Sequence, residues 1–190
     1  MRICVFCASS AELDDIYVRT ARELGRLIGE RGHSLVYGAG RIGLMGEVAT
    51  AVKSAGGHVT GVIPQRLVDY ALNSACVDDL IITETMAERK ALMESRSEAF
   101  VTLPGGFGTL EELLQVLTLK QLQYLHGPVV LLNVNGFYEA LLAHFEQLYA
   151  LSFAKAEFRE LYRVADSPVE ALDYIEGYHE PQLPLKWSDS

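Results

Sequence analysis

One stretch constrains the fold of this chain more than any other: residues 100–112, which read Phe-Val-Thr-Leu-Pro-Gly-Gly-Phe-Gly-Thr-Leu-Glu-Glu. The apolar start of the stretch is typical of a buried strand. The turn after it is rich in glycine, which adopts positive φ and lets a ligand come close to the main chain. Thr109 then begins a long apolar helix as its expected N-cap. Because a helix N-terminus offers free N–H groups and a positive dipole, this order of elements predicts a phosphate site.

The whole chain predicts an α/β fold with a mostly parallel sheet, because candidate strands alternate with candidate helices that cover both faces. The expected strands are residues 2–8, 33–37, 57–63, 79–83, 100–103 and 129–133, and residues 158–164 are expected to form a short helix and a last strand. The expected helices are residues 14–31, 109–125, 137–148 and 168–177, one running to about residue 55 and one starting at residue 85. Residues 64–78 are expected to be an irregular loop. We predict one domain over residues 1–178 and a loose tail over residues 179–190.

Composition narrows the class of protein. The 190 residues, 49% hydrophobic and 22% charged, are enough for one domain with a real core. A net charge of −9 without any basic cluster argues against a nucleic-acid polymer as partner, although a local pocket can still bind a small anion. No apolar run is long enough to span a membrane. The first apolar stretch, residues 3–7, is too short for a signal-peptide core, so we expect a cytoplasmic protein.

Cys4 and Cys7 form a C-x-x-C pattern, which can indicate redox or metal chemistry. Both lie in the first expected strand, where alternation points them to opposite faces of the sheet. We therefore interpret them as core cysteines, and we find no His/Cys cluster that predicts a metal site.

The turn after the second expected strand matches the dinucleotide fingerprint G-x-G-x-x-G with Gly38, Gly40 and Gly43. That fingerprint also requires an acidic residue about 20 positions further on, and the expected strand there contains none. We therefore favour a second wall of a mononucleotide site over NAD binding. Close packing of helix on strand is the structural alternative.

Two cations lie early in the helix that starts at Thr85, where Thr85 and Glu88 have the spacing of a capping box. Arg89 and Lys90 are unusual there, because a helix N-terminus disfavours positive charge. They belong either to a functional site or to a solvated charged face. The expected helix 109–125 is apolar most of the way round, which predicts that a second copy of the chain covers it in a homodimer.

Residues 104–112 resemble the PGGxGTxxE signature of the "Lonely guy" family, the cytokinin riboside 5′-monophosphate phosphoribohydrolases, once widely labelled lysine decarboxylases. The resemblance extends to residues 4–10, 38–46, 88–90 and 131–138. It implies a Rossmann-like fold, a homodimer or larger assembly, no cofactor, and hydrolysis of a purine nucleoside 5′-monophosphate to free base and ribose 5-phosphate. It also implies that Arg89 and Glu112 are the catalytic pair. The residues expected to bind the substrate and its phosphate are Ser9, Gly40, Gly43, Met86, Lys90, Pro104, Gly105, Gly106, Phe107, Gly108 and Thr109.

The chain departs from the family pattern in three places. Ala39 interrupts what is usually a run of three glycines, and Ala8 stands where a glycine is usual. No Glu lies between Pro64 and Ile82, where many members have one that helps to bind the nucleotide. These differences leave the preferred base open.

The residue types themselves also support this chemistry, independently of the resemblance. Cleavage of an N-glycosidic bond passes through an oxocarbenium-like state, which a carboxylate such as Glu112 stabilises while it activates water. Arg89 can make a forked contact with the phosphate or the ribose hydroxyls. The structural alternative for Glu112 is a capping box with Thr109.

Two other functions compete with the phosphoribohydrolase. One is a nucleotide-binding carrier or sensor without turnover. The other is a pyridoxal-phosphate lysine decarboxylase, which needs a Schiff-base lysine in a closed pocket. None of the chain's five lysines, Lys53, Lys90, Lys120, Lys155 and Lys186, has a recognisable setting for that cofactor.

Overall fold

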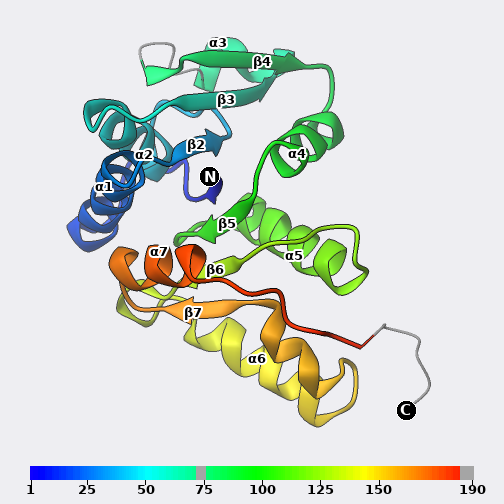
Figure 1. Cartoon of the computed structure of the whole chain (residues 1–190). Helices are drawn as coiled ribbons and strands as arrows, with labels where there is room; N and C mark the ends of the chain where they lie inside the picture. Colours follow the sequence, from blue (N-terminus) through cyan, green and yellow to red (C-terminus); the bar gives the residue numbers. More distant parts are fainter. Residues whose placement is uncertain (72–75, 185–190) are drawn as a thin grey trace.

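The computed structural model describes residues 1–71 and 76–184 of the chain. Within them, strands β1 (Arg2–Phe6), β2 (Ser34–Tyr37), β3 (Val59–Pro64), β4 (Asp79–Thr83), β5 (Ala99–Thr102), β6 (Val129–Leu132) and β7 (Arg163–Ala165) form one sheet. Their order is β4-β3-β2-β1-β5-β6-β7, and every neighbouring pair is parallel (Figure 1). The predicted α/β fold with a parallel sheet is therefore confirmed.

Helices cover both faces of the sheet. The α-helices are α1 (Asp15–Glu30), α2 (Gly43–Ser54), α3 (Val68–Ala71), α4 (Met86–Ser95), α5 (Phe107–Gln121), α6 (Glu139–Ala150) and α7 (Pro168–Glu176), and the 3₁₀ helices are η1 (Gln65–Leu67), η3 (Val134–Gly136) and η4 (Ala156–Leu161). Alternation along β1 separates two cores. Ile3 and Val5 pack with buried residues of α1, α2 and α7, whereas Cys4 and Phe6 pack with those of α4, α5 and α6.

The two cysteines of the C-x-x-C pattern belong to different cores. Cys4 lies in the α4–α5–α6 core and Cys7 in the α1–α2–α7 core, and both are buried free thiols. The prediction that they are core cysteines on opposite faces is confirmed.

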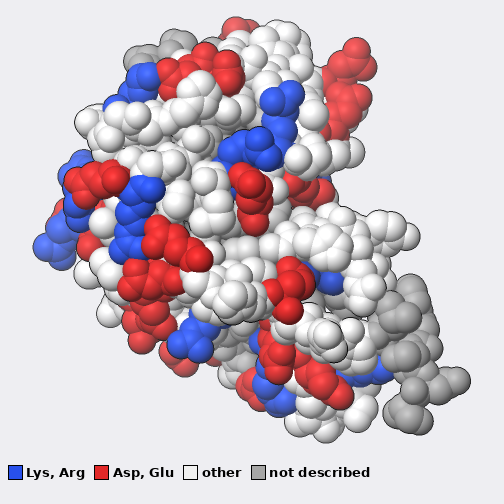
Figure 2. All heavy atoms as spheres, in the orientation of Figure 1, with Lys and Arg blue, Asp and Glu red and all other residues white. Residues whose placement is uncertain are grey.

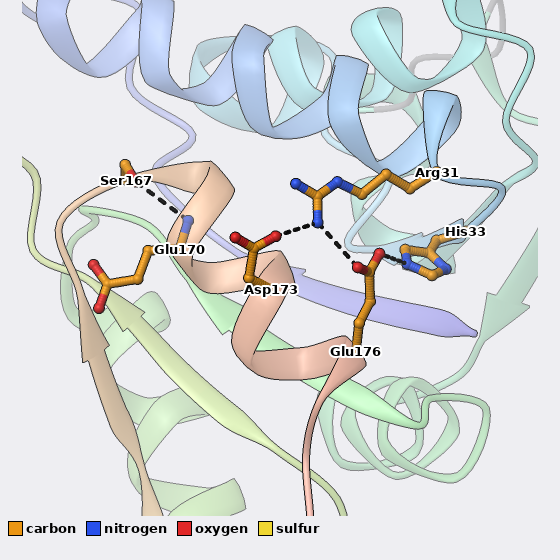
Figure 3. Close-up of polar contacts among 6 residues, drawn as sticks. All are labelled: Arg31, His33, Ser167, Glu170, Asp173 and Glu176. Atoms are coloured by element: carbon orange, nitrogen blue, oxygen red, sulfur yellow. Dashed lines mark hydrogen bonds and ion pairs between the residues drawn. The ribbon is translucent and has the colours of Figure 1, made fainter.

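Polar contacts fasten the last helix to the first (Figure 3). Arg31, which follows α1, donates from Nη1 to Asp173 Oδ1 at 2.7 Å and to Glu176 Oε2 at 3.0 Å. His33 Nε2 lies 2.9 Å from Glu176 Oε1. Ser167 caps α7 by accepting a hydrogen bond from the Glu170 N–H at 3.2 Å, so the helix begins at Pro168 as predicted.

Helix α5 starts and ends earlier than expected. Its first main-chain bond runs from the Leu110 N–H to the Gly106 carbonyl at 3.0 Å, so Gly106 is the N-cap and the prediction of a Thr109 cap is wrong. The helix ends at Gln121 because Gln123 adopts a φ of +61°, which a right-handed helix does not accept. The irregular loop predicted for residues 64–78 is wrong in part, since η1 and α3 occupy residues 65–71.

The segment after α7 has no regular secondary structure as far as residue 184, yet it contacts the end of α5. Lys120 Nζ, which is buried, donates to the Gly127 carbonyl at 2.7 Å and to Tyr178 Oη at 2.8 Å. Glu180 accepts from the Gly127 N–H at 2.9 Å. The rest of the predicted loose tail, residues 185–190, lies outside the described residues.

Among the described residues, no helix has both the length and the apolar run that crossing a membrane requires.

Candidate active site

The order in which the chain adds strands to the sheet reverses between β1 and β5. The chain builds β2, β3 and β4 on one side of β1, then returns to place β5, β6 and β7 on the other. In open parallel sheets, ligands bind outside the carboxyl ends of the strands at such a switch point. A cavity of about 290 Å³ lies there, between the turn after β1 and the first turns of α5. Its lining residues are Cys7, Ala8, Ser9, Ser10, Met45, Arg89, Gly106, Phe107, Gly108, Thr109 and Glu112.

A buried ion pair forms one wall of this cavity. Arg89 Nη1 on α4 lies 3.1 Å from Glu112 Oε1 on α5, and each residue is only 6% exposed. Arg89 Nε also donates to the Val62 carbonyl at 3.2 Å. The two expected catalytic residues, 23 positions apart in the sequence, are therefore in direct contact, and the solvated-face alternative for Arg89 is wrong.

Burial governs the ionisation of Glu112. Removal from water raises the pKa of its carboxyl group, and the Arg89 guanidinium opposes that rise. Glu112 makes no capping bond, because α5 begins at Phe107 and places Glu112 in the second turn. The capping-box alternative with Thr109 is therefore wrong, and the carboxylate is held by Arg89 instead.

The N-terminus of α5 faces the same cavity. The first bond within the helix starts at the Leu110 N–H, so the N–H groups of Phe107, Gly108 and Thr109 precede the main-chain ladder. All three residues line the cavity, although Phe107 as a whole is 93% exposed. A β-carbon on Gly105 would lie 2.6 Å from Thr109 Cβ, so glycine at 105 allows Thr109 to be buried.

The structure gathers only part of the expected substrate-binding set. Ser9, Gly106, Phe107, Gly108 and Thr109 line the cavity with the ion pair. Pro104 and Gly105 line a neighbouring, more apolar cavity of about 230 Å³. The remaining four residues, Gly40, Gly43, Met86 and Lys90, line neither of these two cavities, and Lys90 forms an ion pair with Glu111.

Four lining residues were absent from the expected set: Cys7, Ala8, Ser10 and Met45. The small-residue turn at 8–10 was a usable signal for two of them, because it follows the first strand directly. Cys7 directly follows that strand, and burial, with Glu112 nearby, raises the pKa of its thiol far above the ordinary range. Cys7 is therefore a neutral wall of the cavity at neutral pH.

The described residues contain no group of three His, Cys, Asp or Glu side chains arranged to hold a metal ion. The lysines that they include lie outside the cavity lining, and two of them, Lys53 and Lys90, pair with Asp78 and Glu111. Lys186 is outside the described residues. The arrangement that a pyridoxal-phosphate Schiff base needs, a lysine in the cavity, is not found in the described part of the chain.

Comparisons with known proteins show the family to which the chain belongs. Residues 45–175 match the profile of a family described as "Possible lysine decarboxylase". A probable cytokinin riboside 5′-monophosphate phosphoribohydrolase of Oryza sativa subsp. japonica is 41% identical over all of this chain and 79% of its own length. A cytokinin riboside 5′-monophosphate phosphoribohydrolase of Arabidopsis thaliana is 42% identical over 93% of this chain and 78% of its own. The solved structure of a Moco carrier protein from Chlamydomonas reinhardtii superposes with a TM-score of 0.71 and 27% identity, over 92% of this chain and 94% of that one.

The fold and the cavity together define a Rossmann-like α/β protein with its site at the switch point of the sheet. Within that class, the chain belongs to the cytokinin riboside 5′-monophosphate phosphoribohydrolase family, which is a family of N-glycosidases.

Proposed function

We propose that this protein hydrolyses the N-glycosidic bond of purine nucleoside 5′-monophosphates, AMP or cytokinin riboside 5′-monophosphates, to free base and ribose 5-phosphate. The observation that carries the proposal is the buried Arg89–Glu112 pair, which shares one cavity with the N-terminus of α5. The carboxylate can stabilise positive charge at the anomeric carbon, and the helix N-terminus can bind the 5′-phosphate at the other end of the sugar.

In this proposal the phosphate lies against the N–H groups of Phe107, Gly108 and Thr109, with the Ser9 hydroxyl nearby. These donors and the positive end of the helix dipole match a phosphate in charge and in hydrogen-bonding capacity. A nucleoside without the phosphate loses these contacts, so the 5′-phosphate is expected to be required.

Glu112 acts on the sugar. Its carboxylate stabilises the positive charge that develops as the base leaves, and it takes a proton from the attacking water. The water oxygen bonds to the anomeric carbon, the bond from that carbon to the base nitrogen breaks, and a proton goes to the base. Arg89 favours the ionised form of Glu112 and so opposes burial, which raises the pKa of the carboxyl group and favours the protonated acid.

The test is product analysis with AMP, an N6-prenylated AMP and adenosine, each incubated with the purified protein. Chromatography is expected to detect free base and ribose 5-phosphate from the monophosphates and no base from adenosine. Equal hydrolysis of AMP and adenosine would contradict the assignment of the α5 N-terminus to the phosphate.

A carrier without turnover is the second candidate, favoured by the likeness to the Moco carrier protein of Chlamydomonas reinhardtii. If the protein is a carrier, calorimetry detects binding of the nucleotide and chromatography detects no release of free base. The buried carboxylate beside the anion site favours the hydrolase, because a carrier of an anionic ligand gains nothing from a negative charge there.

We also propose a homodimer built on α5. Leu114 on this helix is 44% exposed, Tyr124 just beyond its end is 79% exposed and Phe153 beyond α6 is 80% exposed. Figure 2 shows the surface over α5, at the right of the view, largely free of charged side chains. Light scattering is expected to give twice the chain mass of 21.0 kDa, and Leu114→Glu is expected to lower it towards one chain. A parent protein that is monomeric at micromolar concentration would contradict this proposal.

A further inference from the structure

The three glycines of the 38–43 turn make room for different groups of the protein itself. A β-carbon on Gly40 would lie 2.7 Å from Met45 Sδ. Gly43 has a φ of +64°, and a β-carbon there would lie 2.8 Å from the Ala8 carbonyl oxygen, in the turn after β1. At Gly38 the neighbour is the Arg89 guanidinium. The fingerprint therefore packs protein groups together, and one of them belongs to the candidate active site.

Gly38 is required for space and not for its backbone conformation. Its φ lies outside the left-handed region that favours glycine. A β-carbon at this position would overlap Arg89 Nη2 and lie 3.1 Å from Cζ and 3.5 Å from Nε. Contacts of that length are too close for a side chain to be added without moving the guanidinium.

The sheet brings Gly38 to this position. Tyr37 of β2 is paired with Gly61 of β3, so Gly38 follows directly beside Val62. Arg89 donates from Nε to the Val62 carbonyl and from Nη1 to Glu112, while Nη2 faces Gly38. The Arg89 side chain thus extends from α4 past the carboxyl ends of β2 and β3, and its guanidinium contacts Glu112 on α5.

We propose that Gly38 is a positioning residue for the reaction: its missing side chain leaves room for the Arg89 guanidinium in the position from which it pairs with Glu112. This proposal depends on the proposed hydrolysis only where it is tested by measuring activity. A β-carbon at residue 38 displaces the guanidinium, which is the far end of a flexible side chain, and so the fold persists while the ion pair is broken.

The displaced guanidinium changes the state of Glu112. The charged and titratable groups that act on Glu112, or on which it acts, are Arg89 and Lys90 of α4, Glu111 of α5, and the thiols of Cys4 and Cys7 around β1. Arg89 is the largest of these that favours the carboxylate. Its withdrawal removes the largest effect that opposes burial and leaves only the weaker one of Lys90, so the carboxyl group titrates at higher pH than in the parent.

The experiment compares Gly38→Ala with a matched control, Gly177→Ala. Gly177 follows α7 with a φ of −93°, and a β-carbon there would lie at an ordinary 3.4 Å from the Asp173 carbonyl oxygen. We expect Gly38→Ala to lose at least about 100-fold in kcat/KM for the monophosphate, the scale of a misplaced catalytic group, with a cooperative unfolding transition retained. We expect Gly177→Ala to match the parent.

A double-mutant cycle with Arg89→Ala separates positioning from any independent role of Gly38. If Gly38 acts through Arg89, then Gly38→Ala in the Arg89→Ala background changes kcat/KM by no more than about twofold. The acid limb of the pH–rate profile is expected to move to higher pH in Gly38→Ala. Losses that multiply in the double variant, or an unchanged profile with full activity in Gly38→Ala, overturn the proposal.

If the parent protein hydrolyses no nucleotide, the proposed function is wrong, but the positioning role of Gly38 can still be tested with the same variants. The titration of the Glu112 carboxyl carbon, followed by NMR in the parent and in Gly38→Ala, does not depend on turnover. A higher midpoint in Gly38→Ala supports the positioning role. An unchanged midpoint overturns it.

Discussion

Replacement of Glu112 by glutamine tests whether the buried carboxylate is a catalytic group. Gln has the same length and keeps one oxygen that can accept from Arg89 Nη1, which lies 3.1 Å from Glu112 Oε1. It removes the negative charge and the capacity to accept a proton from water. The substitution therefore separates the chemistry of the carboxylate from its packing.

The expected cost in stability follows from the burial of the pair. Glu112 and Arg89 are each 6% exposed, and a hydrogen bond to a charged group contributes about 1.5–3 kcal/mol. Part of that is offset, because burial raises the pKa of Glu112 and a neutral Gln avoids this desolvation. We expect a loss of about 1–2 kcal/mol in the free energy of unfolding, which leaves the variant folded for kinetic work.

The expected cost in rate is larger. Loss of a positioned acid–base group lowers turnover by at least about 100-fold, which corresponds to about 2.7 kcal/mol in the activation barrier. The assay is the release of adenine from AMP at saturating substrate, with nucleotide binding measured by calorimetry and stability by urea unfolding. Binding is expected to survive, since the phosphate donors on α5 are untouched.

Glu111→Gln is the matched control. Glu111 is the adjacent residue on the same helix, but its side chain is 54% exposed and pairs with Lys90. Because the Glu111 carboxylate is more than half exposed, water screens the pair, which contributes about 1 kcal/mol or less, and we expect activity close to that of the parent. If Glu112→Gln turns over AMP at near the parent rate, the carboxylate assignment is wrong, and Glu111 and then Glu88 become the candidates.

Two further predictions concern buried titratable groups. Burial lowers the pKa of Lys120 to about 8, below its value in the unfolded chain, so the unfolded state binds more protons between these two values. The parent is therefore expected to gain up to about 2 kcal/mol of stability, relative to Lys120→Met, between about pH 8 and pH 9.5 in urea unfolding; an equal pH dependence in both proteins would contradict this. Cys4 and Cys7 are buried with raised thiol pKa values, whereas Cys76 is half-buried, so Ellman's reagent is expected to modify only Cys76 rapidly in the native protein and all three thiols in urea.

Local patterns predict the secondary structure of this chain well. Alternating strands and helices identify the parallel sheet, and the apolar run before Pro104 identifies β5. The strand–turn–helix order at residues 100–112 also locates the cavity wall, because every residue involved is close in sequence. Structure that depends on contacts within about 13 consecutive residues can be predicted from such patterns.

The start of α5 was not predictable in the same way. Thr109 has the side chain of a helix cap, but glycine at 105 leaves room for that side chain to pack inward, and the helix begins at Phe107 instead. The choice between the two starts depends on how Thr109 is buried, which is a tertiary contact. Capping residues chosen from propensity alone do not include it.

The two glycine-rich turns beside the cavity show why a motif alone does not identify a ligand site. A β-carbon on Gly106 or Gly108 would meet no atom of the described residues within 4 Å, so the main chain there faces unoccupied space. A β-carbon on Gly38 would meet the Arg89 guanidinium. Both turns have the composition of a phosphate loop, but the first is open at Gly106 and Gly108 whereas the second is filled at Gly38. The second turn makes room for an arginine, which lies too far away in the sequence for any local pattern to connect the two.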